Sequence, residues 1–149
     1  MEKMKLMLVD DEEKFLSTMC KLLGKRGYDA VTASSGSDAL EKLRTQNIHV
    51  VILDVKMPEL DGNDMLRAIK RQYPLVEVIM LTGHATVESA IDGLKSGASD
   101  YLMKPADTDE LIRKAEQAYA KRQNLEEKIR VATMLRMTQS ATTIPEENP

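Results

Sequence analysis

The chain has 149 residues, of which 42% are hydrophobic and 30% are charged. This length suits one compact domain with an appendage, and the composition excludes collagen-like repeats, wholesale disorder and disulfide-rich miniproteins. The net charge is −3, divided as −4 in residues 1–120 and +1 in residues 121–149, and the chain has one Phe, four Tyr and no Trp. We therefore expect no direct nucleic-acid binding, which needs a basic face and, for single strands, stacking aromatic rings.

The N-terminal segment and the single cysteine bear on cellular location. No apolar run approaches the roughly 18–20 residues that cross a bilayer, and the first residues do not form a signal peptide. We expect a cytoplasmic protein that does not bind membranes. Cys20 has no second cysteine to pair with, so we expect it to be a small buried side chain.

Short apolar runs alternate with stretches of helical periodicity. In chain order, strands are predicted at 5–9, 28–33, 49–53, 76–81 and 100–103, and helices near 12–23, at 37–45, 65–72 and 86–96, and from about 108. The first helix has its apolar face at Phe15, Met19, Leu22 and Leu23. This alternation predicts an α/β fold, an open doubly wound sheet of five parallel strands, since five units are too few for an eight-stranded barrel.

Residues 1–120 are expected to form the domain, and residues 121–149 a helical extension with a disordered tail from Thr138 to Pro149. The extension is too short to be an output domain. Its apolar residues repeat at helical spacing, at Leu125, Ile129, Ala132 and Leu135. Two interpretations stay open: a solvated helical tail, or a linker or dimer-forming helix whose apolar stripe pairs with a partner, which would allow a homodimer.

Polar residues stand where four of the predicted strands end. They are Asp10 and Asp11 after the first strand, Asp54 after the third, Thr82 after the fourth and Lys104 after the fifth. The carboxyl ends of parallel strands share one edge of the sheet, where such folds bind ligands. Three carboxylates about 4 Å apart repel by about 4 kcal/mol per pair at an effective dielectric constant of 20. We expect Mg²⁺ to offset this repulsion, and beside it an Asp carboxylate is a nucleophile toward phosphorus.

Four segments, in this order, resemble the receiver domain of bacterial response regulators, the CheY-like family of two-component signalling. They read LMLVDDE, LDVKMPELDG, IMLTGHA and GASDYLMKP. The resemblance spans about Lys5 to Tyr119, and the last two segments are similar to receivers of the nitrogen-regulator subgroup. It implies a flavodoxin-like (βα)5 fold with strand order 2-1-3-4-5 and an extended C-terminal helix.

The same resemblance implies a role for each residue. Asp54 would accept a phosphoryl group from a sensor histidine kinase or a phosphotransfer protein, and the resulting change of shape would control a downstream effector or an output domain. Thr82 and Lys104 would contact the phosphoryl oxygens, and Tyr101 would turn inward with Thr82. The Lys104–Pro105 bond would be cis. Mg²⁺ would be held by Asp10, Asp11, Asp54 and the backbone carbonyl of Lys56.

Three further positions are interpreted through the family. Lys56 and His84 would flank the path of the hydrolytic water and set the phosphoryl lifetime, and Gly83 would leave room for the phosphoryl group. Asp61-Gly62 is read as a turn in which Gly62 supplies a positive φ. The chain would catalyse only its own phosphorylation and dephosphorylation, so it would not be an enzyme with external substrates.

Alternatives stay open at the level of residues and of function. Asp10 or Asp11 could cap a helix, Thr82 could be a strand-end hydroxyl, Lys104 a solvated lysine and Tyr101 an ordinary sheet-edge residue. The chain could instead be an interaction module that is never phosphorylated. It could be an aspartate-nucleophile phosphatase, although Lys56 stands where that class has a second acid. An FMN carrier is opposed by the acidic strand ends and the scarcity of aromatic residues.

Overall fold

Five parallel strands form one sheet in the computed structural model, which describes residues 3–57, 60–83 and 87–143. They are β1 (Lys5–Val9), β2 (Asp29–Ala33), β3 (Val50–Asp54), β6 (Glu77–Thr82) and β7 (Asp100–Met103), in the order β2-β1-β3-β6-β7. Counted along these five strands, this is the predicted order 2-1-3-4-5. A short antiparallel pair, β4 (Lys56–Met57) and β5 (Leu60–Asp61), follows β3.

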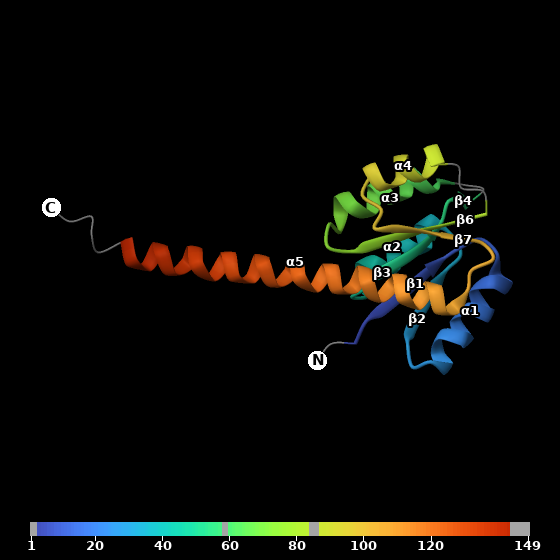
Figure 1. Cartoon of the computed structure of the whole chain (residues 1–149), viewed down its shortest axis with the longest axis horizontal. Coiled ribbons are helices and arrows are strands. Elements are labelled where there is room, and N and C mark those ends of the chain that lie inside the picture. The colour runs from blue at the N-terminus through green and yellow to red at the C-terminus, as the bar shows by residue number, and fades with distance from the viewer. Residues whose placement is uncertain (1–2, 58–59, 84–86, 144–149) are drawn as a thin grey trace.

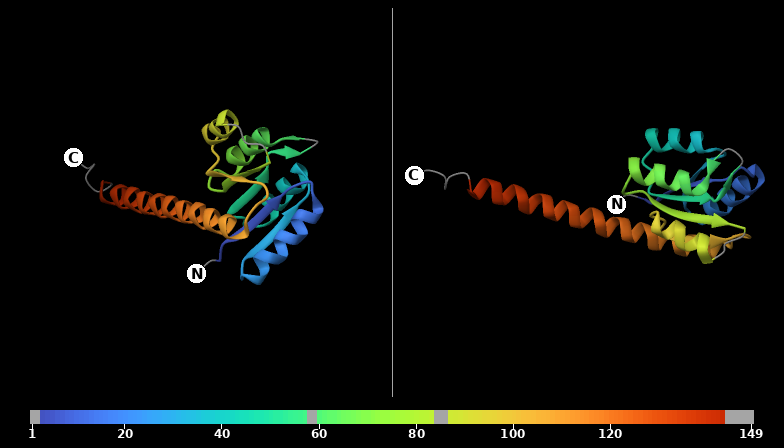
Figure 2. Two further views of the ribbon diagram at one scale, coloured as in Figure 1. Left: turned by 45° about the vertical axis from the view of Figure 1, so that its right-hand side comes forward. Right: turned by 90° about the horizontal axis from the view of Figure 1, so that it is seen from above.

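Helices cover both faces of the sheet, as a doubly wound topology requires. The helices are α1 (Glu13–Lys25), α2 (Gly36–Thr45), α3 (Gly62–Gln72), α4 (Val87–Lys95) and α5 (Thr108–Thr143). Helices α1 and α5 lie on one face, and α2, α3 and α4 lie on the other (Figures 1 and 2). The flavodoxin-like α/β fold predicted from the sequence is confirmed.

Each face of the sheet has its own hydrophobic core. Successive strand residues point to opposite faces, so in β1 Leu6 and Leu8 join the α1/α5 core while Met7 and Val9 join the α2/α3 core. Strand β3 is buried along its whole length. Burial on both faces explains why these strands are apolar throughout instead of alternating.

The packing of α1 differs from the expectation in two side chains. The buried residues of this helix are Leu16, Met19 and Leu23, spaced i, i+3 and i+7, whereas Leu22 is 39% exposed. The buried stripe of α1 therefore contains Leu16 in place of Leu22, and Phe15 packs at its edge as a partly buried residue. Cys20, expected to be buried, is half-buried, and its Sγ lies 3.5 Å from the carbonyl oxygen of Ala30.

Helix α3 begins three residues earlier than predicted. Asp61 caps it by accepting a hydrogen bond from the Asn63 amide at 3.0 Å. Gly62 does not have the positive φ that was expected. It is needed for close approach instead, because a Cβ there would lie 2.6 Å from Cα of Val55. Gly62 thus lets α3 pack directly against the segment that follows β3.

Helix α5 extends far beyond the sheet (Figure 1). The tail was expected to be disordered from Thr138, but the helix continues to Thr143. No Gly or Pro stands between Thr108 and Pro145 to interrupt it. The Thr138 hydroxyl donates to the Met134 carbonyl at 3.0 Å. The division into a domain at 1–120 and an extension at 121–149 stays a prediction. Within the described residues, no helix combines the length and apolarity needed to cross a membrane.

Candidate phosphorylation and metal site

Three carboxylates meet at the carboxyl ends of β1 and β3. Asp10 directly follows β1 and is fully buried, Asp54 is the last residue of β3 and is 5% exposed, and Asp11 is exposed. One oxygen of each lies within 4.8 Å of the other two. Parallel pairing of β1 with β3 brings these strand ends together, as the sequence analysis predicted.

Backbone hydrogen bonds fix the two buried carboxylates. The amide of Asp10 donates to the Ala33 carbonyl at 3.1 Å, and Oδ1 of Asp10 accepts from the Glu12 amide at 2.9 Å. Oδ1 of Asp54 accepts from the Lys56 amide at 3.2 Å. The capping alternative for Asp10 therefore describes only one of its two oxygens, because Oδ2 faces the other carboxylates and Lys104.

Lys104 places its ammonium group among these acids. Its Nζ lies 2.8 Å from Oδ2 of Asp10, 3.0 Å from Oε1 of Glu12 and 3.7 Å from Oδ2 of Asp54. The Lys104 amide donates to the Thr82 carbonyl at 2.8 Å, which helps to aim the side chain. The Lys104–Pro105 bond is cis, as expected. Lys104 is thus an ion-paired residue, and its solvated interpretation is wrong.

The environment changes how easily Asp54 ionises. Burial, reinforced by the negative charge of Asp10, raises the pKa of Asp54 from 3.8 to about 6, against the opposing effects of the Lys56 amide and Lys104. Partial burial lowers the pKa of Lys104, but its contacts with Asp10 and Glu12 outweigh this effect and the net shift is upward. Lys104 is therefore charged at every physiological pH, whereas Asp54 ionises at a cost.

The remaining predicted residues lie around this cluster. Thr82 is buried at the carboxyl end of β6, and a Cβ on Gly83 would meet no atom within 4 Å, so there is space beside it. Lys56 is exposed on β4, and Tyr101 is half-buried on β7. His84 lies outside the described residues.

Two neighbours of Lys104 were missed by the sequence analysis. Glu12 contacts its Nζ, and the ring of Phe15 lies beneath it, with Nζ 5.2 Å from the ring centroid. Phe15 was assigned to the apolar face of α1. The available signal was that Phe15 is the only Phe of the chain and stands two residues after the acidic run Asp10–Glu13.

The donor set fits a hard divalent cation. Asp10 Oδ2 is buried and accepts no well-aligned hydrogen bond from the described residues, although Lys104 is close by. Lys104 supplies one positive charge next to four carboxylates, from Asp10, Asp11, Glu12 and Asp54. Carboxylate oxygens are the ligands that Mg²⁺ and Ca²⁺ prefer, so a bound cation would offset the remaining repulsion.

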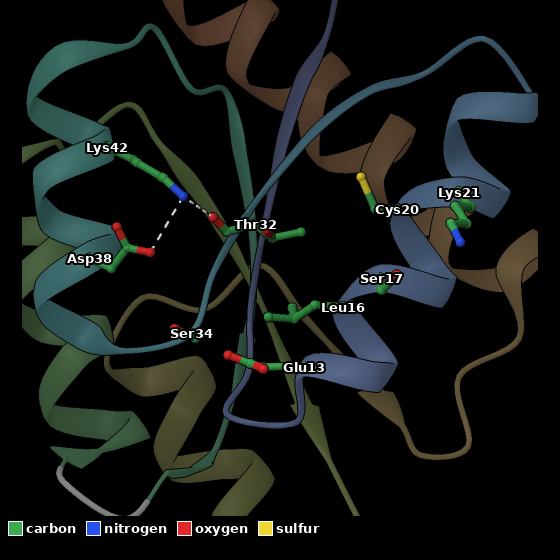
Figure 3. Close-up of a pocket in the computed structure, with 9 residues that line it drawn as sticks. All are labelled: Glu13, Leu16, Ser17, Cys20, Lys21, Thr32, Ser34, Asp38 and Lys42. Carbon is green, nitrogen blue, oxygen red and sulfur yellow. Dashed lines mark hydrogen bonds and ion pairs between the residues drawn. The ribbon is translucent and has the colours of Figure 1, made fainter.

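A separate cavity of about 480 Å³ lies between α1 and α2. Figure 3 shows Lys42 of α2 pointing toward the Thr32 carbonyl and Asp38 on its own side of the cavity, with Cys20 of α1 on the other side. None of the residues predicted to carry the chemistry lines it. Lys42 is already bonded to both of these neighbours.

Comparison with known proteins agrees with this geometry. Residues 6–116 match the response regulator receiver domain family. The chain is 40% identical over 115 residues to the transcriptional regulatory protein ZraR of Escherichia coli K12, covering 77% of this chain and 26% of ZraR. It is 36% identical to a putative NtrX-like response regulator of Rickettsia bellii, covering 85% of this chain and 28% of that protein. The chain thus spans about a quarter of the length of these relatives.

Solved structures show the same fold. A receiver domain protein from Clostridium thermocellum is 38% identical, with a TM-score of 0.77, and the match covers 82% of this chain and 98% of that one. NtrX from Brucella abortus, solved in complex with ADP, is 30% identical with a TM-score of 0.78. That match covers 87% of this chain and 29% of the NtrX chain. On these matches, the chain belongs to the response regulator receiver domain family of two-component signalling.

Proposed function

We propose that this receiver takes up a phosphoryl group on Asp54 and changes shape in response. The observation that carries the proposal is the position of Asp54: its carboxylate is buried, held by the Lys56 amide through one oxygen, and faces Lys104 with the other. An oriented carboxylate next to a fixed cation is suited to attack phosphorus. The nearby carboxylates of Asp10 and Asp11 would repel the incoming phosphate unless they were neutralised.

The transfer exchanges one bond to phosphorus for another. A carboxylate oxygen of Asp54 forms the new P–O bond while the P–N bond to a phosphohistidine of the donor breaks, and the imidazole leaves with the electron pair. Charge builds on the phosphoryl oxygens in the transition state. Lys104 is placed to neutralise part of that charge, and the Thr82 hydroxyl to donate a hydrogen bond.

Magnesium is the cation that we assign to the carboxylates. Asp10, Asp11, Asp54 and the backbone carbonyl of Lys56 would hold it, and when bound it supplies positive charge that shields the phosphoryl oxygens from the aspartates. Asp10 and Asp11 then act by orienting the ion, while Asp54 both binds it and reacts. Neutralising the cluster also removes the cost of ionising Asp54.

The partners follow from the chemistry and from the relatives. A sensor histidine kinase or a phosphotransfer protein would donate the phosphoryl group. The change of shape that follows would control a downstream effector or an output domain. The relatives ZraR and the NtrX-like regulator are about four times longer than the matched region, which supports an output function outside this chain. We place the protein in the cytoplasm with such kinases.

Intact mass after incubation with acetyl phosphate and Mg²⁺ tests the proposal. The parent should gain one phosphoryl group, and Asp54→Asn should gain none. Asp64→Asn is the matched control, because Asp64 is an exposed aspartate of α3 that pairs with Arg67, and this variant should be labelled like the parent. A parent that gains no mass, or an Asp54→Asn variant that is labelled equally, would contradict the assignment.

A further inference from the structure

Helix α4 has a glycine where a tyrosine from the neighbouring strand reaches it. A Cβ on Gly93 would overlap the Tyr101 hydroxyl oxygen and would lie 2.8 and 2.9 Å from Cζ and Cε2 of the same ring. Real Cβ contacts are essentially never below 3.0 Å. The end of the Tyr101 ring therefore occupies the space that any other residue at position 93 would fill.

The backbone conformation at position 93 does not itself require a glycine. Gly93 lies inside α4 and does not have a positive φ, and a glycine at such a position destabilises a helix relative to alanine. The chain turns with positive φ only four residues later, at Gly97. The absent side chain of Gly93 is therefore explained by the close approach of Tyr101.

This contact lies where α4 is anchored. The Gly93 carbonyl accepts from the Ser96 amide at 3.1 Å and from the Ala98 amide at 3.0 Å, which closes the last turn of the helix. Gly93 is buried, whereas Ile91 and Leu94 on the same helix are 45% and 50% exposed. Position 93 is thus the described part of α4 that rests on the body of the domain.

Tyr101 connects this position to the sheet. It pairs with Met80 of β6, two residues before Thr82, and packs against the core on the α2/α3 face. Burial raises the pKa of the Tyr101 phenol, as does the charge of Asp92, against a hydrogen bond from the Gly93 backbone. The hydroxyl therefore lies against the backbone of α4 at Gly93.

We propose that Gly93 is a positioning residue for Tyr101: the gap left by its missing side chain, which we call the Gly93 notch, holds the ring against α4. Because the notch is formed by backbone, the ring can leave only by changing rotamer, and α4 can shift only if the ring moves with it. The notch thus links the position of α4 to the orientation of Tyr101. Its part in signalling rests on the proposed function, in which Tyr101 responds to Thr82.

A double-mutant cycle read by urea unfolding tests the contact. Gly93→Ala should lower the unfolding midpoint of the parent, because the methyl group collides with the ring. In a Tyr101→Ala background the same change should raise the midpoint, because only the helix preference for alanine remains. Gly24→Ala is the control, since a Cβ there meets nothing within 4 Å, and it should raise the midpoint in both backgrounds. An increase by Gly93→Ala in both backgrounds would overturn the proposal.

A spectroscopic measurement decides the matter if Tyr101→Ala fails to fold. With ¹³C-labelled tyrosine, the Tyr101 ring signal, assigned by its loss in Tyr101→Phe, should move in Gly93→Ala and stay in place in Gly24→Ala. An unmoved signal in Gly93→Ala would refute the notch. Phosphorylated parent protein should shift the signal in the same direction as Gly93→Ala. Failure of acetyl phosphate to label the parent would contradict the proposed function, while the cycle would still test the notch on its own.

Discussion

The two ends of the sheet both contain buried polar groups, but they treat them in opposite ways. At the amino end, Nδ1 of His49 accepts the Lys5 amide at 2.9 Å, the Arg122 guanidinium donates to the Ile48 carbonyl at 3.0 Å, and Glu77 accepts from the Ser99 hydroxyl. At the carboxyl end, the carboxylates of Asp10, Asp11 and Asp54 face one another. The polar groups named at the amino end have hydrogen-bond partners, whereas the carboxyl end keeps three carboxylates close together.

The difference is informative because burial has the same physical cost at both ends. A buried polar group without a partner costs about 1–3 kcal/mol, and buried like charges cost more. The chain avoids this cost at the amino end and accepts it at the carboxyl end. An unfavourable arrangement that persists in a folded protein is typical of a functional site.

Removing the Lys104 ammonium group from the carboxyl end should have the largest effect on stability. In Lys104→Met, Asp10 and Asp54 lose their nearest positive charge, so we expect a loss of about 3 kcal/mol in the free energy of unfolding at neutral pH without Mg²⁺. Urea unfolding measures it, with Lys95→Met as an exposed control from α4. Saturating Mg²⁺ should recover part of the loss, because a ligand that binds only the folded state stabilises it. A variant as stable as the parent in metal-free buffer would contradict the electrostatic comparison.

Removing one of the repelling negative charges should instead stabilise the folded protein. The folded-state pKa of Asp54 is about 6 against 3.8 for the free side chain, so the folded protein binds more protons between these values and its stability falls as pH rises through this window. Asp54→Asn removes this penalty, so at neutral pH the metal-free variant should be more stable by up to about 3 kcal/mol, at about 1.4 kcal/mol per pKa unit. The gain should disappear near pH 4.

Unfolding curves of parent and variant from pH 4 to 7.5 measure this difference directly. Asp64→Asn is the control, since its carboxylate is exposed and paired with Arg67. A stability difference between parent and Asp54→Asn that does not change with pH would show that repulsion at Asp54 is not its source.

How much the sequence predicted also differs between the two ends. The carboxyl-end residues could be located because each stands directly after an apolar strand, so topology alone brings Asp10, Asp54 and Thr82 to one edge. The partners at the amino end were not predicted. Arg122 was assigned only to the helical extension, yet its side chain bonds to Ile48, 74 residues earlier in the chain. Contacts of this kind depend on packing angles that local periodicity does not contain.

Side-chain detail was the other limit of sequence reasoning. Helical spacing predicted a helix near residues 12–23, close to the observed Glu13–Lys25, but it did not distinguish Leu16 from Leu22 as the buried residue. Gly62 was misread for a similar reason, and no role was predicted for Gly93. Other atoms lie close to both glycines, and such approaches are visible only in three dimensions.

Breaking a satisfied contact at the amino end should cost less and should not depend on metal. Arg122→Met keeps the apolar stem and removes the hydrogen bond to the Ile48 carbonyl, so we expect a loss of about 2 kcal/mol. Arg136→Met, on the exposed part of α5, should change stability by less than about 0.5 kcal/mol. Mg²⁺ should stabilise Arg122→Met as much as it stabilises the parent. A metal-dependent difference would show that the two ends are coupled.

The smallest effect is expected at Glu12, the exposed member of the carboxyl-end cluster. Its carboxylate lies 3.0 Å from Lys104 but is 65% exposed, so solvent screens the pair and Glu12→Gln should cost less than about 1 kcal/mol. Glu13→Gln is the matched control, because it removes the same charge one residue later, on the side of the cavity between α1 and α2.

The difference between the two glutamate variants should be measured by urea unfolding at low and high salt. We expect a small extra loss in Glu12→Gln at low ionic strength that vanishes near 1 M salt, where the Debye length is about 3 Å. A loss that persists at high salt would place Glu12 among the buried groups of the cluster. Glu12 would then behave like the buried carboxylates Asp10 and Asp54, even though its side chain is 65% exposed.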